Sequence, residues 1–141
     1  MGFRVRVTGA EPFEFMEDVI TTANVKIDIP ADSNARSKDM GATVVITGKI
    51  LTGLDGAVAD QSIKAAKWSL VPAEKADAYR SYTLDVISAG QVVRQYVFPQ
   101  AFCIDYKEDY DDETGVGTFT LICKQKKDKL DLLQINGGYS A

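Results

Sequence analysis

Apolar and polar side chains alternate along much of this chain, most clearly in its second half. The alternating apolar residues are Tyr82, Leu84 and Val86, then Phe102, Ile104 and Tyr106, and finally Phe119, Leu121 and Cys123. A period of two is typical of β-strands with one buried face, so we predict strands over 82–87, 92–106 and 118–123. Pro99 falls inside the middle run and predicts either two strands or one strand with a bulge.

The first half of the chain shows the same alternation in three runs. They predict strands over residues 3–8, 19–29 and 43–51. Residues 11–18 mix acidic and aromatic residues without a clear period, and we predict a turn or a short irregular link there. The leucines and isoleucine within 130–135 predict one more short element.

Residues 58–70 are the best helix candidate. The residues that share an apolar helical face are Ala59, Ile63, Ala66 and Leu70. Pro72 ends the helix, and Trp68 lies off the apolar face, so we expect its ring to pack at the helix end. Seven or eight strands with one helix favour a β-barrel or a β-sandwich with the helix packed against it.

The length, composition and net charge of the chain limit the classes of protein to which it can belong. The chain has 141 residues, 45% hydrophobic and 26% charged, which predicts a single globular domain over 1–141. The net charge of −4 argues against broad attraction to nucleic acid or anionic membranes. The sequence shows no apolar run long enough to cross a membrane and no secretory leader pattern at its start.

The inventory of reactive side chains argues against most catalytic sites. Histidine is absent, which excludes Ser-His-Asp, Cys-His and His-metal chemistry. Cys103 and Cys123 are symmetric about an acidic turn and predicted to be near neighbours across two strands; we interpret them as buried thiols. We therefore predict that the chain has no catalytic residue, metal or cofactor and is not an enzyme.

An acidic stretch lies between the last two predicted strands, at residues 108–115. Its carboxylates, together with Asp105, are a candidate calcium site. Their order lacks the alternating spacing of oxygen ligands that an EF-hand calcium loop has. A solvated hairpin turn that ends at Gly115 is the favoured interpretation. A hydrolase that uses a pair of carboxylates from residues 105–113 is the least favoured of the functions considered for this chain.

Charges of opposite sign flank the strand predicted over 118–123, acidic residues before it and basic residues after it. The acidic residues are Asp111, Asp112 and Glu113, and the basic residues are Lys124, Lys126 and Lys127. The strand holds these groups about 20 Å apart, at about 3.3 Å per residue. Such a subunit is suited to head-to-tail contact with copies of itself, which closes into rings or propagates into filaments. The alternative is that both charge runs are merely solvated strand ends.

Residues 31–41 form a long polar connection between two predicted strands. Connections of this length within a domain are usually functional or mobile. From composition alone, a solvated loop is slightly favoured.

The order of several motifs resembles a known family. A helical run that ends near Trp68 and a strand pair are followed by Phe98-Pro-Gln-Ala101-Phe102, by the acidic aromatic turn that contains Tyr110, and by Gly117-Thr-Phe-Thr-Leu-Ile. This order resembles the Hcp-like tube proteins of type VI secretion, which are related in fold to phage tail-tube proteins. The resemblance covers about residues 19–123; residues 124–131 and the leucines after them fit the pattern less well.

The resemblance implies a single β-barrel with one flanking helix and a six-membered ring. It also implies that rings stack into a tube within a sheath, with baseplate or spike proteins as partners and cargo in the lumen. The connection over 31–41 would reach the neighbouring ring, through Asp32, Arg36, Lys38 and Asp39. Some members of this family carry a protease label, but the residues of this chain offer no mechanism for proteolysis.

The leading hypothesis from the sequence is therefore a structural subunit of the inner tube of a contractile injection system or phage-tail-like particle. It would be assembled in the cytoplasm without a signal peptide and then ejected or retained in the particle. The alternative from another class is a monomeric β-barrel that binds a small ligand, which predicts an apolar internal cavity.

Overall fold

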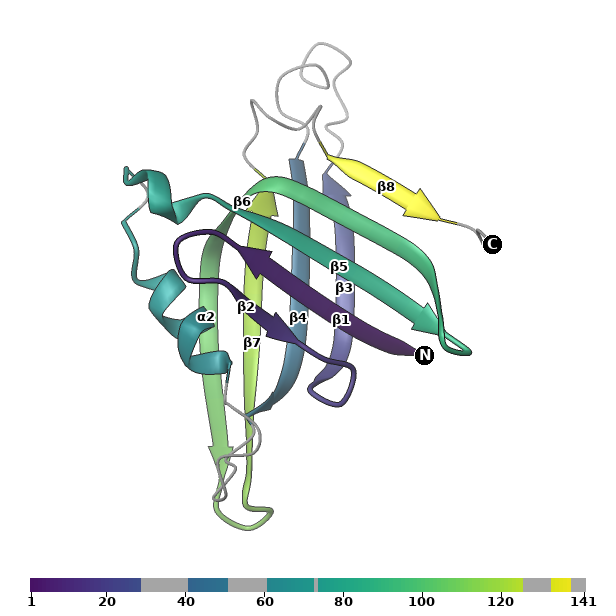
Figure 1. The fold of residues 1–141 in the computed structure, drawn as a ribbon. Helices are drawn as coiled ribbons and strands as arrows, with labels where there is room; N and C mark the ends of the chain where they lie inside the picture. Colours follow the sequence, from purple (N-terminus) through teal and green to yellow (C-terminus); the bar gives the residue numbers. More distant parts are fainter. Residues whose placement is uncertain (29–40, 51–60, 73, 126–132, 138–141) are drawn as a thin grey trace.

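The computed structural model describes residues 1–28, 41–50, 61–72, 74–125 and 133–137. Its elements, in chain order, are β1 Gly2–Thr8, β2 Phe13–Phe15, β3 Ile20–Asp28, β4 Gly41–Ile50, α2 Ser62–Ser69, a 3-10 helix Ala76–Ala78, β5 Arg80–Ser88, β6 Gln91–Asp111, β7 Val116–Gln125 and β8 Gln134–Gly137. The mainly β fold with one flanking α-helix that the sequence predicts is confirmed over these residues (Figure 1).

The strands form one antiparallel sheet of eight strands that curls over on itself. Its order is β2-β1-β5-β6-β7-β4-β3, and β8 pairs with the first part of β6. In Figure 1, β1, β2 and β5 cross in front of β3, β4 and β7. The end strands β2 and β3 are not paired with each other in the described part of the chain, so the ladder stays open where a closed barrel would continue it.

Strand β6 belongs to both layers of the curled sheet. Its first half pairs with β5 and its second half with β7, and Ala101 is the residue where the two ladders meet. An extra residue of β6 lies between the partners of Arg80 and Tyr82, next to Pro99. The backbone N–H of Gln100 donates to Oε1 of the buried Gln125 at 3.1 Å. Of the two alternatives predicted at Pro99, one strand with a bulge is the one observed, and the bulge is where the strand passes from one layer to the other.

Side chains from both layers and the helix fill the core between the layers. The residues with almost no exposed surface include Val5, Val7, Tyr82, Leu84 and Phe98 from one layer and Val44, Ile46, Phe119, Leu121 and Cys123 from the other. They come from alternating positions of their strands, as the period of two predicts. Val86 and Ile104 depart from the prediction: Val86 is only partly buried and Ile104 is 46% exposed, because each lies beside a bulge that shifts the alternation.

The 3-residue strand β2 corrects the prediction of a turn or irregular link over 11–18. Phe13 and Phe15 are 3% and 2% exposed, and β2 pairs with β1. A strand this short contains a single apolar-polar-apolar step, which is too little to establish a period.

The helix α2 buries a different face from the one predicted. Ile63 is 54% and Leu70 80% exposed, whereas Ala65 and Trp68 are buried; Ala59 lies outside the described residues. The indole ring of Trp68 determines which face of the helix is buried, because it is the largest apolar side chain of the helix. Burying it stabilises the fold more than burying an isoleucine or a leucine would.

Trp68 packs into the core at the end of the helix, as predicted. Its Nε1 donates to the backbone carbonyl of Ala78 at 2.9 Å. The guanidinium of Arg80 lies 5.4 Å from the centre of the indole ring and forms an ion pair with Asp77 at 3.2 Å. These contacts attach the helix and the following 3-10 turn to the start of β5.

Candidate assembly surfaces

The hairpin of β6 and β7 extends beyond the rest of the sheet and carries three exposed acidic residues at its tip. Asp111, Asp112 and Glu113 form this acidic tip. The Asp111 carboxylate accepts from the backbone N–H of Glu113 at 2.9 Å, and its carbonyl accepts from Gly115 N–H at 2.9 Å. Gly115 has φ of 69°, which glycine adopts without strain. The carboxylates are therefore displayed on an ordered turn.

The strands continue further toward the tip than the sequence predicts. The sequence predicts a turn over 108–115, but β6 remains paired with β7 up to Asp111. Glu108 and Asp109 thus belong to the strand. Residues 107–111 of β6 are exposed on both faces, so no alternation of apolar and polar residues marks this part of β6 as a strand.

A hydrogen-bonded group of side chains stiffens the hairpin below the acidic tip. The Glu108 carboxylate accepts from the Tyr106 hydroxyl at 2.7 Å and from the Tyr110 hydroxyl at 2.6 Å. The Tyr106 oxygen also lies 3.4 Å from the carbonyl of Ser62, in the first turn of α2. The hairpin is therefore tied to the helix as well as to its neighbouring strands.

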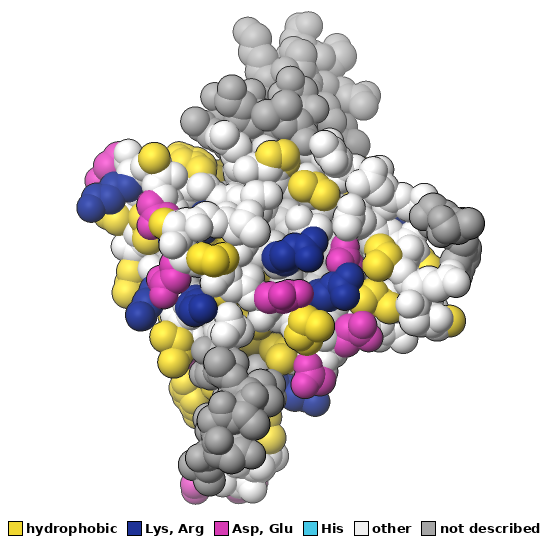
Figure 2. Space-filling view, viewed as in Figure 1, with side chains coloured by type: hydrophobic (Ala, Val, Ile, Leu, Met, Phe, Trp, Pro, Cys, Tyr) yellow, Lys and Arg dark blue, Asp and Glu magenta, His cyan; other side chains and the backbone are white. Residues whose placement is uncertain are grey.

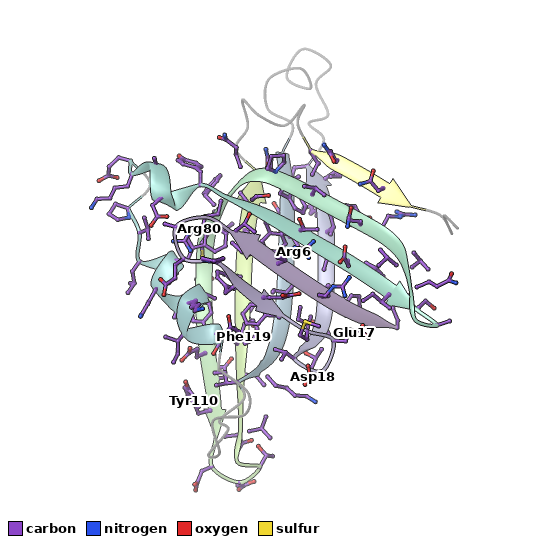
Figure 3. The ribbon with its side chains drawn as sticks, viewed as in Figure 1. Arg6, Glu17, Asp18, Arg80, Tyr110 and Phe119 are labelled. Carbon is purple, nitrogen blue, oxygen red and sulfur yellow. The ribbon has the colours of Figure 1, made fainter. Side chains whose placement is uncertain are left out.

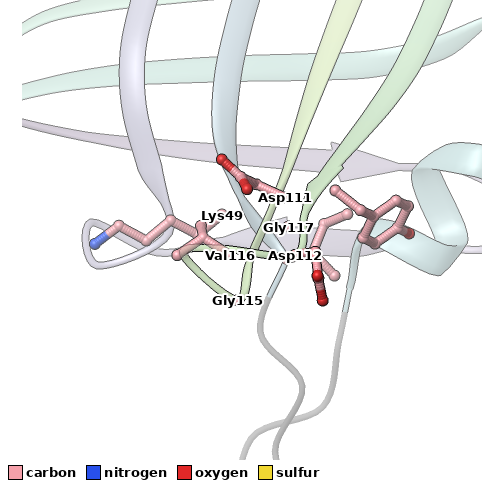
Figure 4. A pocket seen from close by; sticks show the side chains of 8 residues that line it. Lys49, Asp111, Asp112, Gly115, Val116 and Gly117 are labelled. Carbon is pink, nitrogen blue, oxygen red and sulfur yellow. The ribbon is translucent and has the colours of Figure 1, made fainter.

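A shallow hollow of about 690 Å³ lies beside the tip, between β4 and the hairpin (Figure 4). Its lining includes the aliphatic side chain of Ile50, the ring of Tyr110, the carboxylates of Asp111 and Asp112, and Lys49. The described residues contain no group of three or more acidic or cysteine side chains that could hold a metal ion. The hollow is wide and mixed in polarity, which fits contact with another protein surface better than enclosure of a small ligand.

Register places Lys124 at the opposite end of the sheet from the acidic tip. Lys124 is opposite Thr43 on β4 and Phe102 on β6, while Gly117 is opposite Ile50 and Tyr110. Strand β7 has 10 residues, so the two ends are about 30 Å apart at about 3.3 Å per residue. The separation of opposite charges is thus larger than the sequence predicts.

The strands that flank the polar connection over 31–41 reach the same end of the sheet as Lys124. Asp28, the last residue of β3, pairs with Gly41, the first of β4. Thr43 Oγ1 donates to Asp28 Oδ2 at 3.2 Å. The remaining predicted contact residues lie outside the described residues; they are Asp32, Arg36, Lys38, Asp39, Lys126 and Lys127.

A polar row that the sequence did not reveal crosses four strands in register. Its members are Arg4 on β1, Asp85 on β5, Gln95 on β6 and Asn136 on β8. Asp85 Oδ2 accepts from Arg4 Nη2 at 2.9 Å and Oδ1 from Gln95 Nε2 at 2.9 Å. Asn136 Nδ2 donates to Gln95 Oε1 at 3.1 Å. In the sequence, Arg4 and Arg6 alternate with Phe3, Val5 and Val7, which indicates a polar face on this strand but not the partners that it meets on other strands.

Charges of both signs lie close together on the outer face of β1. Figure 2 shows basic and acidic side chains side by side in this region, and Figure 3 places Arg6 on β1 and Glu17 and Asp18 in the turn after β2. This face differs from the acidic tip, where Asp111, Asp112 and Glu113 are all exposed. A mixed surface of this kind gives little net attraction to a charged partner.

The two cysteines are directly opposite each other on β6 and β7, as their symmetric spacing predicts. Both are free thiols. Cys123 is buried, as interpreted from the sequence, whereas Cys103 is partly exposed, so the interpretation of two buried thiols is wrong for Cys103. Burial raises the pKa of the Cys123 thiol well above its usual value, while a hydrogen bond from Cys123 lowers the pKa of Cys103. Burial also raises the pKa of the nearby Tyr82 hydroxyl, which has no hydrogen-bond partner in the described part of the chain.

Among the described helices, none has the length and apolar character needed to cross a membrane.

Comparisons with known proteins show the fold. No protein-family model matches the chain, and no curated protein matches it in sequence. Its structure is similar to that of Hcp1 from Flavobacterium johnsoniae, with a TM-score of 0.59, 13% identity, and coverage of 98% of this chain and 97% of that one.

Two further solved structures contain similar chains. One is the cryo-EM structure of the anti-feeding prophage baseplate, 6-fold symmetrised, with a TM-score of 0.58, 10% identity, and coverage of 99% of this chain and 95% of that one. The other is the sheath-tube complex of an extracellular contractile injection system, PVC, in its extended state. It gives a TM-score of 0.54, 10% identity, and coverage of 97% and 89%. The chain therefore has an Hcp-like, tail-tube-like fold.

Proposed function

We propose that this chain is a structural subunit that assembles with its own copies into rings, which stack to form the inner tube of a contractile injection system or phage-tail-like particle. The observation that carries the proposal is the likeness in fold, over nearly the whole chain, to chains of a baseplate and of a sheath-tube complex. Rings of six subunits are the expected form, since the similar baseplate is described as 6-fold symmetrised.

The open sheet supports self-association. In the described part of the chain, β2 and β3 are end strands, each paired on one side only. An unpaired strand edge presents backbone donors and acceptors to any other chain. Contact between the edges of neighbouring copies satisfies these groups and leads to a closed ring.

The separated charges support stacking of one ring on the next. The acidic tip lies at one end of the sheet and Lys124 at the other, so the acidic end of one subunit can face the basic end of the next. We propose that the tip, Lys124 and the polar connection with Asp32, Arg36, Lys38 and Asp39 contribute to these contacts, together with Lys126 and Lys127. A heterologous contact of this type propagates along an axis rather than closing on itself.

Sheath proteins would surround the tube, baseplate or spike proteins would contact its end, and cargo would pass through its lumen. We expect assembly in the cytoplasm, followed by ejection or incorporation into an extracellular particle. The role is structural and requires no catalytic group or cofactor.

A charge-swap experiment tests the stacking contact. Asp112→Lys should reduce the assembled fraction in sedimentation velocity, because it places a positive charge on the tip, which would then face the basic end of the next subunit. Adding Lys124→Glu in the same chain should restore much of the assembly, because the new glutamate offers a partner of opposite charge to the new lysine. Glu74→Lys, at an exposed position away from the hairpin, is the matched control and should assemble normally. If Asp112→Lys assembles as well as this control, the tip is not a stacking contact.

A further inference from the structure

Cys103 and Cys123 occupy directly opposed positions in neighbouring strands of an antiparallel sheet. Side chains at opposed positions project to the same face, with Cα atoms about 4.5 to 5.5 Å apart. This range falls within the Cα separation of about 4.4 to 6.8 Å that a disulfide tolerates. Cys123 belongs to the core cluster and Cys103 packs against it, so the two sulfurs can be joined with little movement of the backbone.

The two thiols differ in accessibility and in chemistry. Cys103 is partly exposed, and its sulfur lies 3.5 Å from the carbonyl oxygen of Asp105 across the bulge at Ile104. The hydrogen bond from Cys123 favours the thiolate of Cys103 and lowers its pKa. Cys123 has no exposed surface, and burial holds it as a thiol. A reagent in solution therefore reaches Cys103 first.

We propose that Cys103 and Cys123 form a modification site, which a small-molecule disulfide such as oxidised glutathione converts into a cross-strand disulfide. Cys103 is the attacking thiol and Cys123 the resolving thiol. This inference is independent of the proposed function, since it rests on the register and burial of two residues within one chain.

The exchange proceeds in two balanced steps. The Cys103 thiolate attacks one sulfur of the oxidant, so a mixed disulfide forms and one thiolate of the oxidant leaves and takes up a proton. Cys123 then gives up its proton and attacks the Cys103 sulfur, which forms the intrachain bond and releases the second thiolate. The protein loses two hydrogen atoms and is oxidised by two electrons, and the oxidant is reduced to two thiols.

The disulfide would fasten β6 to β7 beside the Ile104 bulge. The segment that it closes contains the whole acidic tip and the Glu108 hydrogen bonds. Cross-linking this segment restricts the unfolded chain, so the oxidised protein should unfold at a higher denaturant concentration than the reduced one.

Intact-mass measurement of the full chain tests the proposal. Reduced protein, freed of reductant and incubated with oxidised glutathione, should lose the mass of two hydrogen atoms and should no longer react with N-ethylmaleimide after denaturation. Added reductant should reverse both changes. The product should remain a single chain on a non-reducing gel.

Single variants separate the roles of the two thiols. Cys123→Ser should stop at a stable glutathione adduct on Cys103, because the resolving thiol is missing. Cys103→Ser should react with oxidised glutathione at about one tenth of the wild-type rate or more slowly still, because the reagent poorly reaches the buried Cys123. Cys123→Ala and Cys103→Ala serve if a serine variant fails to fold.

Three outcomes of the wild-type measurement would overturn the proposal. They are a lasting glutathione adduct without the intrachain bond, a disulfide between two chains, and a folded protein whose thiols remain unchanged while the denatured chain oxidises. The wild-type measurement decides among these without reference to any variant.

Discussion

Close packing at single residues limits which side chains this sheet accepts, and Gly48 is the sharpest case. Gly48 is buried in β4, and a Cβ atom placed on it would lie 2.7 Å from the ring of Phe119 and 3.0 Å from the carbonyl oxygen of Val19. Both neighbours belong to the core or its edge. A methyl group therefore has no room unless the aromatic ring moves.

Gly48→Ala should lower the free energy of unfolding by about 1 to 3 kcal/mol, the usual cost of overpacking a core. Urea denaturation measures this change. Gly41→Ala is the control, since the nearest atom to its Cβ is an oxygen of Asp28 at 3.7 Å, an ordinary contact. Equal stability of the two variants would show that the Phe119 ring is not held against Gly48.

The buried carboxylate of Asp85 leads to a second prediction. It is 3% exposed and accepts hydrogen bonds from Arg4 and Gln95. Asp85→Ala should lower the free energy of unfolding by about 2 kcal/mol, because both donors lose their acceptor. Asp109→Ala removes the exposed pair with Lys107 and should cost less than about 1 kcal/mol. The same urea measurement compares the two, and an equal cost would contradict the role assigned to the polar row.

At the scale of elements, the attachment of α2 depends on one side chain. Trp68→Ala should lower the free energy of unfolding by about 3 to 5 kcal/mol, as expected for loss of a buried aromatic ring. Ile63→Ala should change it little, because Ile63 is 54% exposed. Thermal or urea unfolding followed by circular dichroism gives both values. A larger cost for Ile63→Ala would support the helix face predicted from the sequence instead.

The sequence predicted most elements because alternation is strong wherever one face of a strand is buried. It missed β2, which is too short to show a period, and the outer part of β6, where both faces are exposed. It placed Ile63 and Leu70 on the buried face of the helix because spacing alone cannot weigh one large ring against two aliphatic side chains. Pro99 was informative because its missing N–H restricts where a ladder can continue.

At the scale of the whole molecule, the order of strands follows from contacts between residues far apart in the chain. Strand β1 pairs with β5 and β4 with β7, and no local pattern specifies such pairings. The resemblance of ordered motifs, rather than periodicity, supplied the tail-tube-like fold. The charges at the two ends could be predicted because β6 and β7 form a simple hairpin, whereas the polar row required the register of four strands.

The central claim is that this chain assembles into rings and tubes, and negative-stain electron microscopy of the purified full chain tests it most directly. Images across a concentration series should show rings with a central channel, or hollow tubes, in proportions that rise with concentration. Particles the size of one subunit at every concentration would contradict the claim.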